Sequence, residues 1–375
     1  MSHAGHSHGH HDHHHHHAIA EDADAGKLRI ALALLTTFLV AEVVTAIFAR
    51  SLALFSDAGH MLTDAAAIGL ALVILFTVML AMYAMVFLVP GDPASLALGP
   101  RATPELKHEL TVRMGLDQPL AVQVYRFFSN AVTGDLGYDV WSKRPVSEEI
   151  AEVFPQTLIL GVAAIGWALT LGIALGCAAV VWRNSWVDRL LGLLSVSMIA
   201  VPSFVIAIYG LLIFAVTLNW LPAIGAGEAG DPASQAKALI LPAFAVGIGW
   251  VGYLARVVRA AMLEVMEAPH IRTARAFGLP ERRVVMKYAL RIAIIPTISV
   301  VAVGLGSILS SAVFVETVFT RPGIGTLITA AVQKRNYPVV MGTVLVMTAF
   351  YLCVVTAADL LIARLDPRVR DALRS

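Results

Sequence analysis

The amino-acid sequence predicts an all-α membrane protein with about seven transmembrane helices, and three observations support this fold class. The 375 residues are 58% hydrophobic and 14% charged, whereas soluble domains carry about 25% charged residues. Apolar runs close to the roughly 20 residues that cross a bilayer recur along the chain. Lysine and arginine are concentrated in polar segments that fall on one side of these runs. The net charge of +1 provides no field for nucleic acid, so we expect the lipid bilayer as the main environment.

Each expected span is an apolar run bounded by polar segments. Residues 90–155 and 261–291 are polar and long enough to hold structure of their own, whereas the Gly/Ala/Pro-rich residues 219–238 are expected to be irregular. We expect spans at residues 28–49, 58–89, 156–181, 190–218, 239–260, 292–317 and 339–363.

Basic residues predict how these spans are oriented. Eight lysines and arginines lie between Arg256 and Arg291, and further arginines lie in residues 182–189 and after the last span. Because cytoplasmic loops carry an excess of lysine and arginine, these three segments are predicted to be cytoplasmic. The opposite side of the membrane then holds residues 90–155, 219–238 and 318–338.

The sequence offers no recognisable catalytic constellation. It contains no G-x-x-x-x-G-K-[ST] phosphate-binding loop, and no arrangement of a nucleophile beside a base stands out. Cys177 and Cys353 lie inside apolar runs, which favours core packing over a disulfide framework. Glu316 and Asp359 lie near span ends, where a carboxylate either serves a gate or caps a helix end. The sequence therefore predicts a protein that is not an enzyme.

The loop at residues 261–291 is centred on Gly278. The arginines around this glycine alternate with Ala274, Ala276 and Leu279, a pattern that predicts a small apolar contact for a groove in a soluble partner. Gly278 allows a backbone turn and close approach, and Pro280 suits the first turn of a following helix. An ordinary basic cytoplasmic loop is the alternative interpretation.

Short motifs follow one another from about residue 74 to residue 370. In order along the chain they are VPGDP at 89–93, ATPE at 102–105, GLDQP at 115–119, GDLG at 134–137, PQT at 155–157, VPSF at 201–204, HIRTARAFG at 270–278, ETVF at 316–319, PGIG at 322–325, YPVV at 337–340 and DPRVR at 366–370. This ordered set resembles the dipeptide, oligopeptide and nickel permeases of ABC importers.

The resemblance implies an ABC importer permease core of six spans, of which residues 73–89 form the first and residues 156–375 contain the rest. It implies that the chain binds no cofactor, and that ATP and Mg²⁺ bind to partner subunits. The implied partners are a second permease, two ABC ATPases and an external binding protein, in the inner membrane of a prokaryote. Peptide and nickel remain alternative substrates. The residues implied to couple to an ATPase are Arg272, Thr273, Ala274, Arg275, Ala276, Gly278 and Leu279.

The N-terminal residues 1–72 have a different character. Residues 1–26 predict a disordered tail that binds Zn or Ni, because imidazoles are good ligands for these metals. Residues 27–72 resemble the opening of a cation diffusion facilitator, in which Asp57, His60 and Asp64 share one helix face and form part of a metal site. The sequence lacks the second half of that site. The histidines of the tail are His3, His6, His8, His10, His11, His13, His14, His15, His16 and His17.

The two resemblances make opposite demands on residues 58–89. A facilitator requires this stretch to cross from outside to inside, whereas the permease requires its first span to cross from inside to outside. We expect the permease orientation, with the tail outside, because the basic residues from Arg256 to Arg291 outweigh Lys27 and Arg29. The alternative functions are a proton-coupled zinc or cation exporter and a metal-binding fusion that transports nothing.

Overall fold

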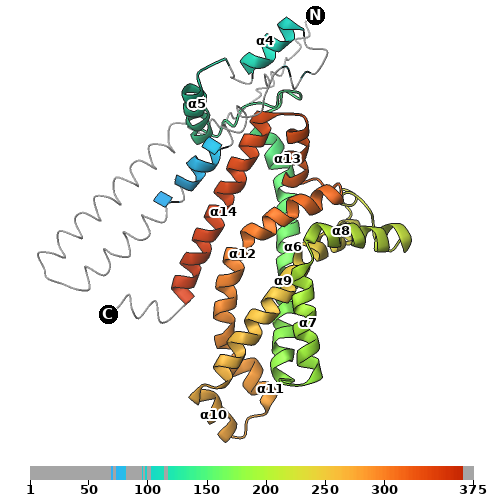
Figure 1. Cartoon of the computed structure of the whole chain (residues 1–375), viewed down its shortest axis with the longest axis vertical. Coiled ribbons are helices and arrows are strands. Elements are labelled where there is room, and N and C mark those ends of the chain that lie inside the picture. Colours follow the sequence, from blue (N-terminus) through green and yellow to red (C-terminus); the bar gives the residue numbers. More distant parts are fainter. Residues whose placement is uncertain are drawn as a thin grey trace, which may run out of the picture. The chain divides into compact units, whose positions relative to one another are not determined.

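The computed structural model of the chain describes residues 69–70, 73–81, 95, 98, 103–113 and 117–365 (Figure 1). The chain divides into two units, Met1–Leu62 and Thr63–Ser375, and all described residues belong to the second. The histidine-rich tail, Asp57, His60 and the expected span at 28–49 therefore lie outside the described residues. Asp64 and most of the expected span at 58–89 lie outside them as well.

Helices make up nearly all of the described part of the second unit. Within the described residues, the one pairing of extended backbone is an isolated antiparallel bridge between Tyr138 and Pro145. The helices are α4 (Pro104–Arg113), α5 (Leu120–Val132), α6 (Val146–Val181), α7 (Trp186–Ala200), α8 (Ser203–Gly210), α9 (Pro232–Met266), α10 (Pro269–Ala276), α11 (Glu281–Arg283), α12 (Leu290–Val318), α13 (Ile324–Gln333) and α14 (Tyr337–Leu365), with π-helical segments η2 (Leu211–Thr217) and η3 (Val284–Ala289).

Three described helices are long and apolar enough to cross a membrane: α6, α9 and the Tyr337–Ala357 part of α14. The helix α7 and the segment Ser203–Thr217 count as a fourth span if they are taken together, although they meet at a bend of 95°. The expected span at 292–317 lies within the 29 residues of α12. Helix α6 begins ten residues before the expected span at 156–181, because Pro155 is accommodated inside the helix.

The bend between α7 and α8 corrects the expectation of one continuous span at 190–218. Val201 has extended backbone angles, φ −90° and ψ 122°, and Pro202 follows it. A proline disfavours the α conformation in the residue before it and lacks an N–H group for the helix ladder. The chain therefore leaves α7 at Ala200 and starts α8 in a new direction at Ser203.

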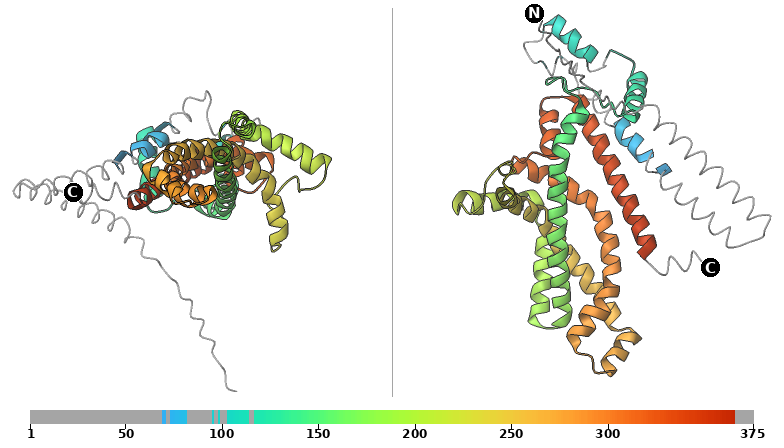
Figure 2. Two further views of the ribbon diagram at one scale, coloured as in Figure 1. Left: turned by 90° about the horizontal axis from the view of Figure 1, so that it is seen from below. Right: turned by 180° about the vertical axis from the view of Figure 1, so that it is seen from behind.

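Helices α6 and α9 form the centre of the described unit and pack side by side (Figure 2). A Cβ atom on Gly172 would lie 2.8 Å from the Cβ of Leu254, and one on Gly176 would lie 2.8 Å from the Cβ of Val258. Small residues at this spacing let two helix backbones approach closely, which is how helices associate where water gives no driving force. Helices α10 and α11 lie at one end of this pair and α13 lies at the other (Figures 1 and 2).

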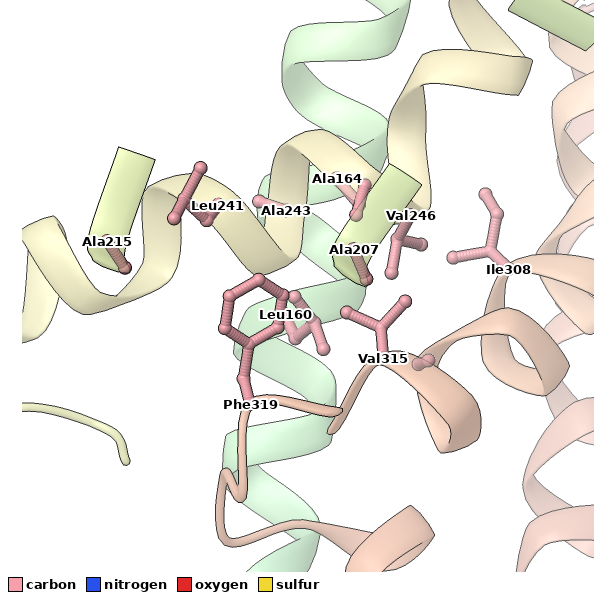
Figure 3. Close-up of a cluster of buried hydrophobic side chains, with 12 residues drawn as sticks. Leu160, Ala164, Ala207, Ala215, Leu241, Ala243, Val246, Ile308, Val315 and Phe319 are labelled. Carbon is pink, nitrogen blue, oxygen red and sulfur yellow. The ribbon is translucent and has the colours of Figure 1, made fainter. Parts of the chain in front are cut away.

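A cluster of buried side chains joins α6, α8, α9, α12 and η2 (Figure 3). Its alanines allow the bent α8–η2 segment to approach α9, and the ring of Phe319 fills the space below them, 2% exposed. The labelled members are Leu160, Ala164, Ala207, Ala215, Leu241, Ala243, Val246, Ile308, Val315 and Phe319.

A buried carboxylate fixes α13 to α6 and α12. Glu316 is fully buried and accepts hydrogen bonds from the backbone N–H of Gly325 and from the hydroxyl of Thr157, each at 2.7 Å. The Thr157 hydroxyl in turn accepts the N–H of Ile324 at 2.8 Å. A side chain on Gly323 would collide with the Glu316 carboxylate. Glu316 thus caps the N-terminus of α13, one of the two roles that its sequence context left open.

Candidate functional site

The first candidate site is the turn that joins α10 to α11. Helix α10 ends with the backbone N–H of Phe277 bonded to the carbonyl of Thr273 at 3.0 Å, and the N–H of Gly278 bonded to the carbonyl of Arg275 at 2.9 Å. Gly278 has φ +74°, a left-handed conformation that suits glycine at the end of a helix. The predicted turn at this glycine is therefore present.

An ion pair closes this turn. The Nη2 and Nε atoms of Arg275 donate to the two carboxylate oxygens of Glu281, at 2.6 and 3.1 Å. The guanidinium beside Glu281 lowers the pKa of that carboxyl, and the pair holds the start of α11 against the end of α10. Arg275 was predicted to couple to an ATPase, and in this structure its guanidinium is bound to Glu281 within the loop.

The loop residues predicted to couple to an ATPase divide into an outer and an inner set. Arg272, Thr273, Arg275, Ala276 and Gly278 are exposed, and Leu279 is half-buried.

Ala274 differs from expectation because it faces inward. It is 6% exposed and packs in one cluster with Ile271, which is fully buried, against Val258 and Met262 of α9 and Val284 of η3. It therefore anchors α10 to α9 rather than presenting an apolar contact to a partner.

Of the large apolar side chains of this loop, that of Phe277 is the most exposed, at 81%. No role was predicted for Phe277, because the sequence pattern alone does not show which face of α10 packs against α9. The sequence feature that could have indicated its exposure is its place at the end of a helix, directly before Gly278.

The second candidate site is a cavity of about 740 Å³ between the α7–α8 bend, α9 and α12. Its described lining combines aromatic rings with hydroxyl groups and includes no charged side chain. The rings of Trp250 and Tyr253 meet edge to face with centroids 5.5 Å apart, and Gly304 leaves the room that Trp250 needs. The lining residues are Ile199, Val201, Pro202, Ser203, Val246, Gly249, Trp250, Tyr253, Val300, Gly304, Ser307 and Ser311.

Residues of the bend at Pro202 form one wall of this cavity, and none of the lining residues was predicted as a site. The sequence feature that could have indicated this cavity is the presence of serine and aromatic residues within apolar spans. Such residues also occur where helices simply pack against one another, so they did not identify a site. The predicted metal ligands cannot be placed, since Asp57, His60, Asp64 and the tail lie outside the described residues. Within the part of the chain that the structure describes, no group of three or more His, Cys, Asp or Glu side chains is arranged to hold a metal ion.

Comparison with known protein families gives two matches. Residues 168–371 match the family described as binding-protein-dependent transport system inner membrane component. Residues 66–161 match the family of N-terminal segments of the same membrane components. Neither match includes residues 1–65.

Curated relatives match over most of their length. The glutathione transport system permease protein GsiC of Escherichia coli (strain K12) and that of Shigella flexneri serotype 5b (strain 8401) are each 37% identical over 296 residues, which are 79% of this chain and 94% of the relative. The GsiC of Salmonella paratyphi A (strain ATCC 9150 / SARB42) is 38% identical over the same shares.

Among solved structures, a chain of the MetNI methionine ABC transporter in an inward-facing conformation aligns with a TM-score of 0.48 and 15% identity, covering 58% of this chain and 96% of that one. From the family and sequence matches, the chain belongs to the binding-protein-dependent transport system inner membrane components, permease subunits of the bacterial inner membrane that act with a second permease, two ATPases and a substrate-binding protein.

Proposed function

We propose that this chain lines half of the translocation path for a peptide-like solute, and that α10 with the turn at Phe277–Gly278 receives the motion of an ATPase subunit. The path is the 740 Å³ cavity between the α7–α8 bend, α9 and α12. The observation that carries the proposal is the way α10 is built, with its inner face fixed to α9 and its outer tip free for a partner.

The inner face of α10 supports a role in transmitting force. Ile271 and Ala274 pack against Val258 and Met262 of α9 and against Val284 of η3, which leads into α12. Packed side chains deform little, so a push on α10 moves the ends of α9 and α12 with it. Both helices also line the cavity, which supports a coupling between the motion of α10 and the proposed path of the solute.

The outer tip of α10 supports a docking role. Exposed aromatic residues are common anchors at the centre of protein interfaces, where a groove on the partner surrounds them. The Phe277 ring lies at the tip with the arginines Arg272 and Arg282 exposed nearby in sequence. A partner groove with an apolar floor and an acidic rim would complement this surface. The ATPase subunits of the importer are the partners that this surface fits.

The cavity lining supports a peptide-like solute over a nickel ion. Its hydroxyl groups, from Ser203, Ser307 and Ser311, can exchange hydrogen bonds with amide groups, and its rings can pack against side chains. Nickel prefers imidazole, thiolate and carboxylate ligands, and the described lining offers none of them. The glutathione permeases among the relatives point in the same direction.

The test uses the complete importer reconstituted in proteoliposomes, with ATP-driven uptake of labelled glutathione as the readout. We expect Phe277→Asp to reduce uptake by at least about tenfold, because a charge at an apolar contact costs about 1.4 kcal/mol or more of binding free energy. It should also reduce the amount of ATPase that copurifies. Phe277→Leu keeps an apolar side chain and is the matched control, with uptake within about twofold of the original protein.

Uptake and copurification at the original level in Phe277→Asp would overturn the docking role. A fully active transporter that carries nickel and no peptide would overturn the assignment of the solute.

A further inference from the structure

A second cavity, of about 450 Å³, lies between α7 and α9 on the side of the first cavity that is nearer to α10. Its lining differs sharply from that of the first, because it is rich in charge. Three arginines and one aspartate contribute, so the formal charge of the lining is 3 − 1 = +2. The lining residues are Asp188, Arg189, Gly192, Val196, Arg256, Arg259 and Ala260.

The two cavities are successive parts of one groove. On α9 the first is lined by Gly249 and Tyr253 and the second by Arg256 and Ala260, so steps of four, three and four residues connect them. Residues three and four apart lie on one face of a helix. The step from Tyr253 to Arg256 is about 4.5 Å along the helix axis, less than one turn.

Helix α7 supplies the opposite wall in the same way. Ile199 lines the first cavity, and Val196 and Gly192 line the second, at steps of three and four residues. The two walls touch tightly behind the groove, where a Cβ atom on Gly252 would collide with the carbonyl of Ser195. A solute in the first cavity therefore meets the second cavity next on its way towards the end that carries α10.

Two of the three arginines are available to a solute. Arg259 is held by Asp188, with Nε to Oδ1 and Nη2 to Oδ2 distances of 2.8 Å each, and Asp188 also accepts the backbone N–H of Asn184. This pair is neutral as a whole. Arg189 and Arg256 are exposed, and among the described residues no ion pair or side-chain hydrogen bond is recorded for either guanidinium.

We propose that Arg189 and Arg256 form an inner carboxylate-binding site on the translocation path, which makes the path selective for peptide-like solutes that carry negative charge. The inference rests on the proposed function, because it assumes that the solute follows the groove. Guanidinium groups pair with carboxylates through two parallel hydrogen bonds. Moving an unpaired carboxylate through an apolar span is costly, and a cationic site at the inner end offsets that cost.

The position of the site determines which kinetic constant it affects. Capture of the solute is the task of the external binding protein, whereas Arg189 and Arg256 lie near the inner end of the groove. Loss of the two charges should therefore lower the kcat for uptake of an acidic solute and leave its KM unchanged. A neutral solute of the same size should lose nothing.

The experiment uses the complete importer in proteoliposomes, with an acidic tripeptide and the same tripeptide bearing amides in place of its side-chain and terminal carboxylates. The double variant Arg189→Gln/Arg256→Gln should lower kcat for the acidic tripeptide by about fivefold relative to the amide form. The double variant Arg189→Lys/Arg256→Lys, which keeps the charges, should retain most of the preference. Arg183→Gln is the control, because it removes a nearby exposed arginine that does not line the groove.

Equal kcat changes for the two tripeptides, or no change in either, would overturn the inference. A loss that affects both tripeptides alike and depends on anionic phospholipid in the vesicles would overturn it too and would assign the arginines to lipid headgroups. If the double glutamine variant does not assemble with its partners, the single Arg256→Gln variant faces the same comparison. Original protein that takes up neither tripeptide would overturn the proposed function, and the inference would fail with it.

Discussion

Replacing Glu316 should weaken the attachment of α13 to α6 and α12, and the size of the effect follows from its contacts. Glu316→Ala leaves the backbone N–H of Gly325 and the hydroxyl of Thr157 without an acceptor in a fully buried site. Each unsatisfied buried group costs about 1–3 kcal/mol, so the expected loss in unfolding free energy is about 2–6 kcal/mol. Glu316→Gln keeps one acceptor oxygen and should lose about 1 kcal/mol.

The assay is unfolding of the detergent-solubilised permease by increasing SDS, followed by the fluorescence of its six tryptophans. Ser310→Ala is a suitable control, because that hydroxyl is exposed and bonds only to the carbonyl of Gly306 in its own helix. Its loss should cost less than about 0.5 kcal/mol. An alanine at position 316 that is as stable as the original protein, or no less stable than Ser310→Ala, would refute the capping role of Glu316.

Two further predictions concern the loop between α10 and α11. Gly278→Ala should destabilise the turn by about 1–2 kcal/mol, because φ is +74° there, and in the same SDS titration Gly161→Ala, inside α6 with open space around it, should not destabilise the protein. Equal costs at the two glycines would argue against a strained turn. Arg275 lowers the pKa of Glu281, so the ion pair stabilises the loop above the ordinary glutamate pKa of about 4.3 and loses this effect as pH falls through the lowered value. Both side chains are largely exposed, so the effect is at most about 1 kcal/mol. Proteolysis of the loop at falling pH should accelerate in the original protein and be independent of pH over this range in Glu281→Gln; a pH dependence retained in the variant would contradict this role.

Hydropathy and charge predicted the membrane fold of this protein, and the family resemblance carried by its ordered motifs predicted the partners and the location. The helical membrane fold, the set of partner subunits and the inner-membrane location are confirmed. The glycine turn at Gly278 was predictable because a single residue type dictates it. Membrane-spanning helices were predictable from hydropathy averaged over a window, because a helix in lipid must be apolar along its whole length.

The features that sequence reasoning missed depend on which neighbours a helix meets. Pro202 breaks a helix, whereas Pro242 lies inside α9, and both look alike in an apolar run. Ala274 and Phe277 each lie two residues after an arginine, yet packing on α9 buries the first and leaves the second exposed. The groove lined by Tyr253 and Arg256 exists only because α7 stands beside α9. Periodicity defines the faces of a helix without indicating what each face touches.

The glycines between α6 and α9 have a mechanical consequence. Gly172 and Gly176 bring the backbones of α6 and α9 into close contact. Because tightly packed helices deform little, we expect the two to move together as one rigid body. At one end of this pair α9 ends at Met266 and α10 begins three residues later, at Pro269. At the other end, hydrogen bonds of Thr157 and Glu316 connect α6 and α12 to α13. A displacement applied at the α10 end of this pair is therefore transmitted along α6 and α9 to the end that holds α13.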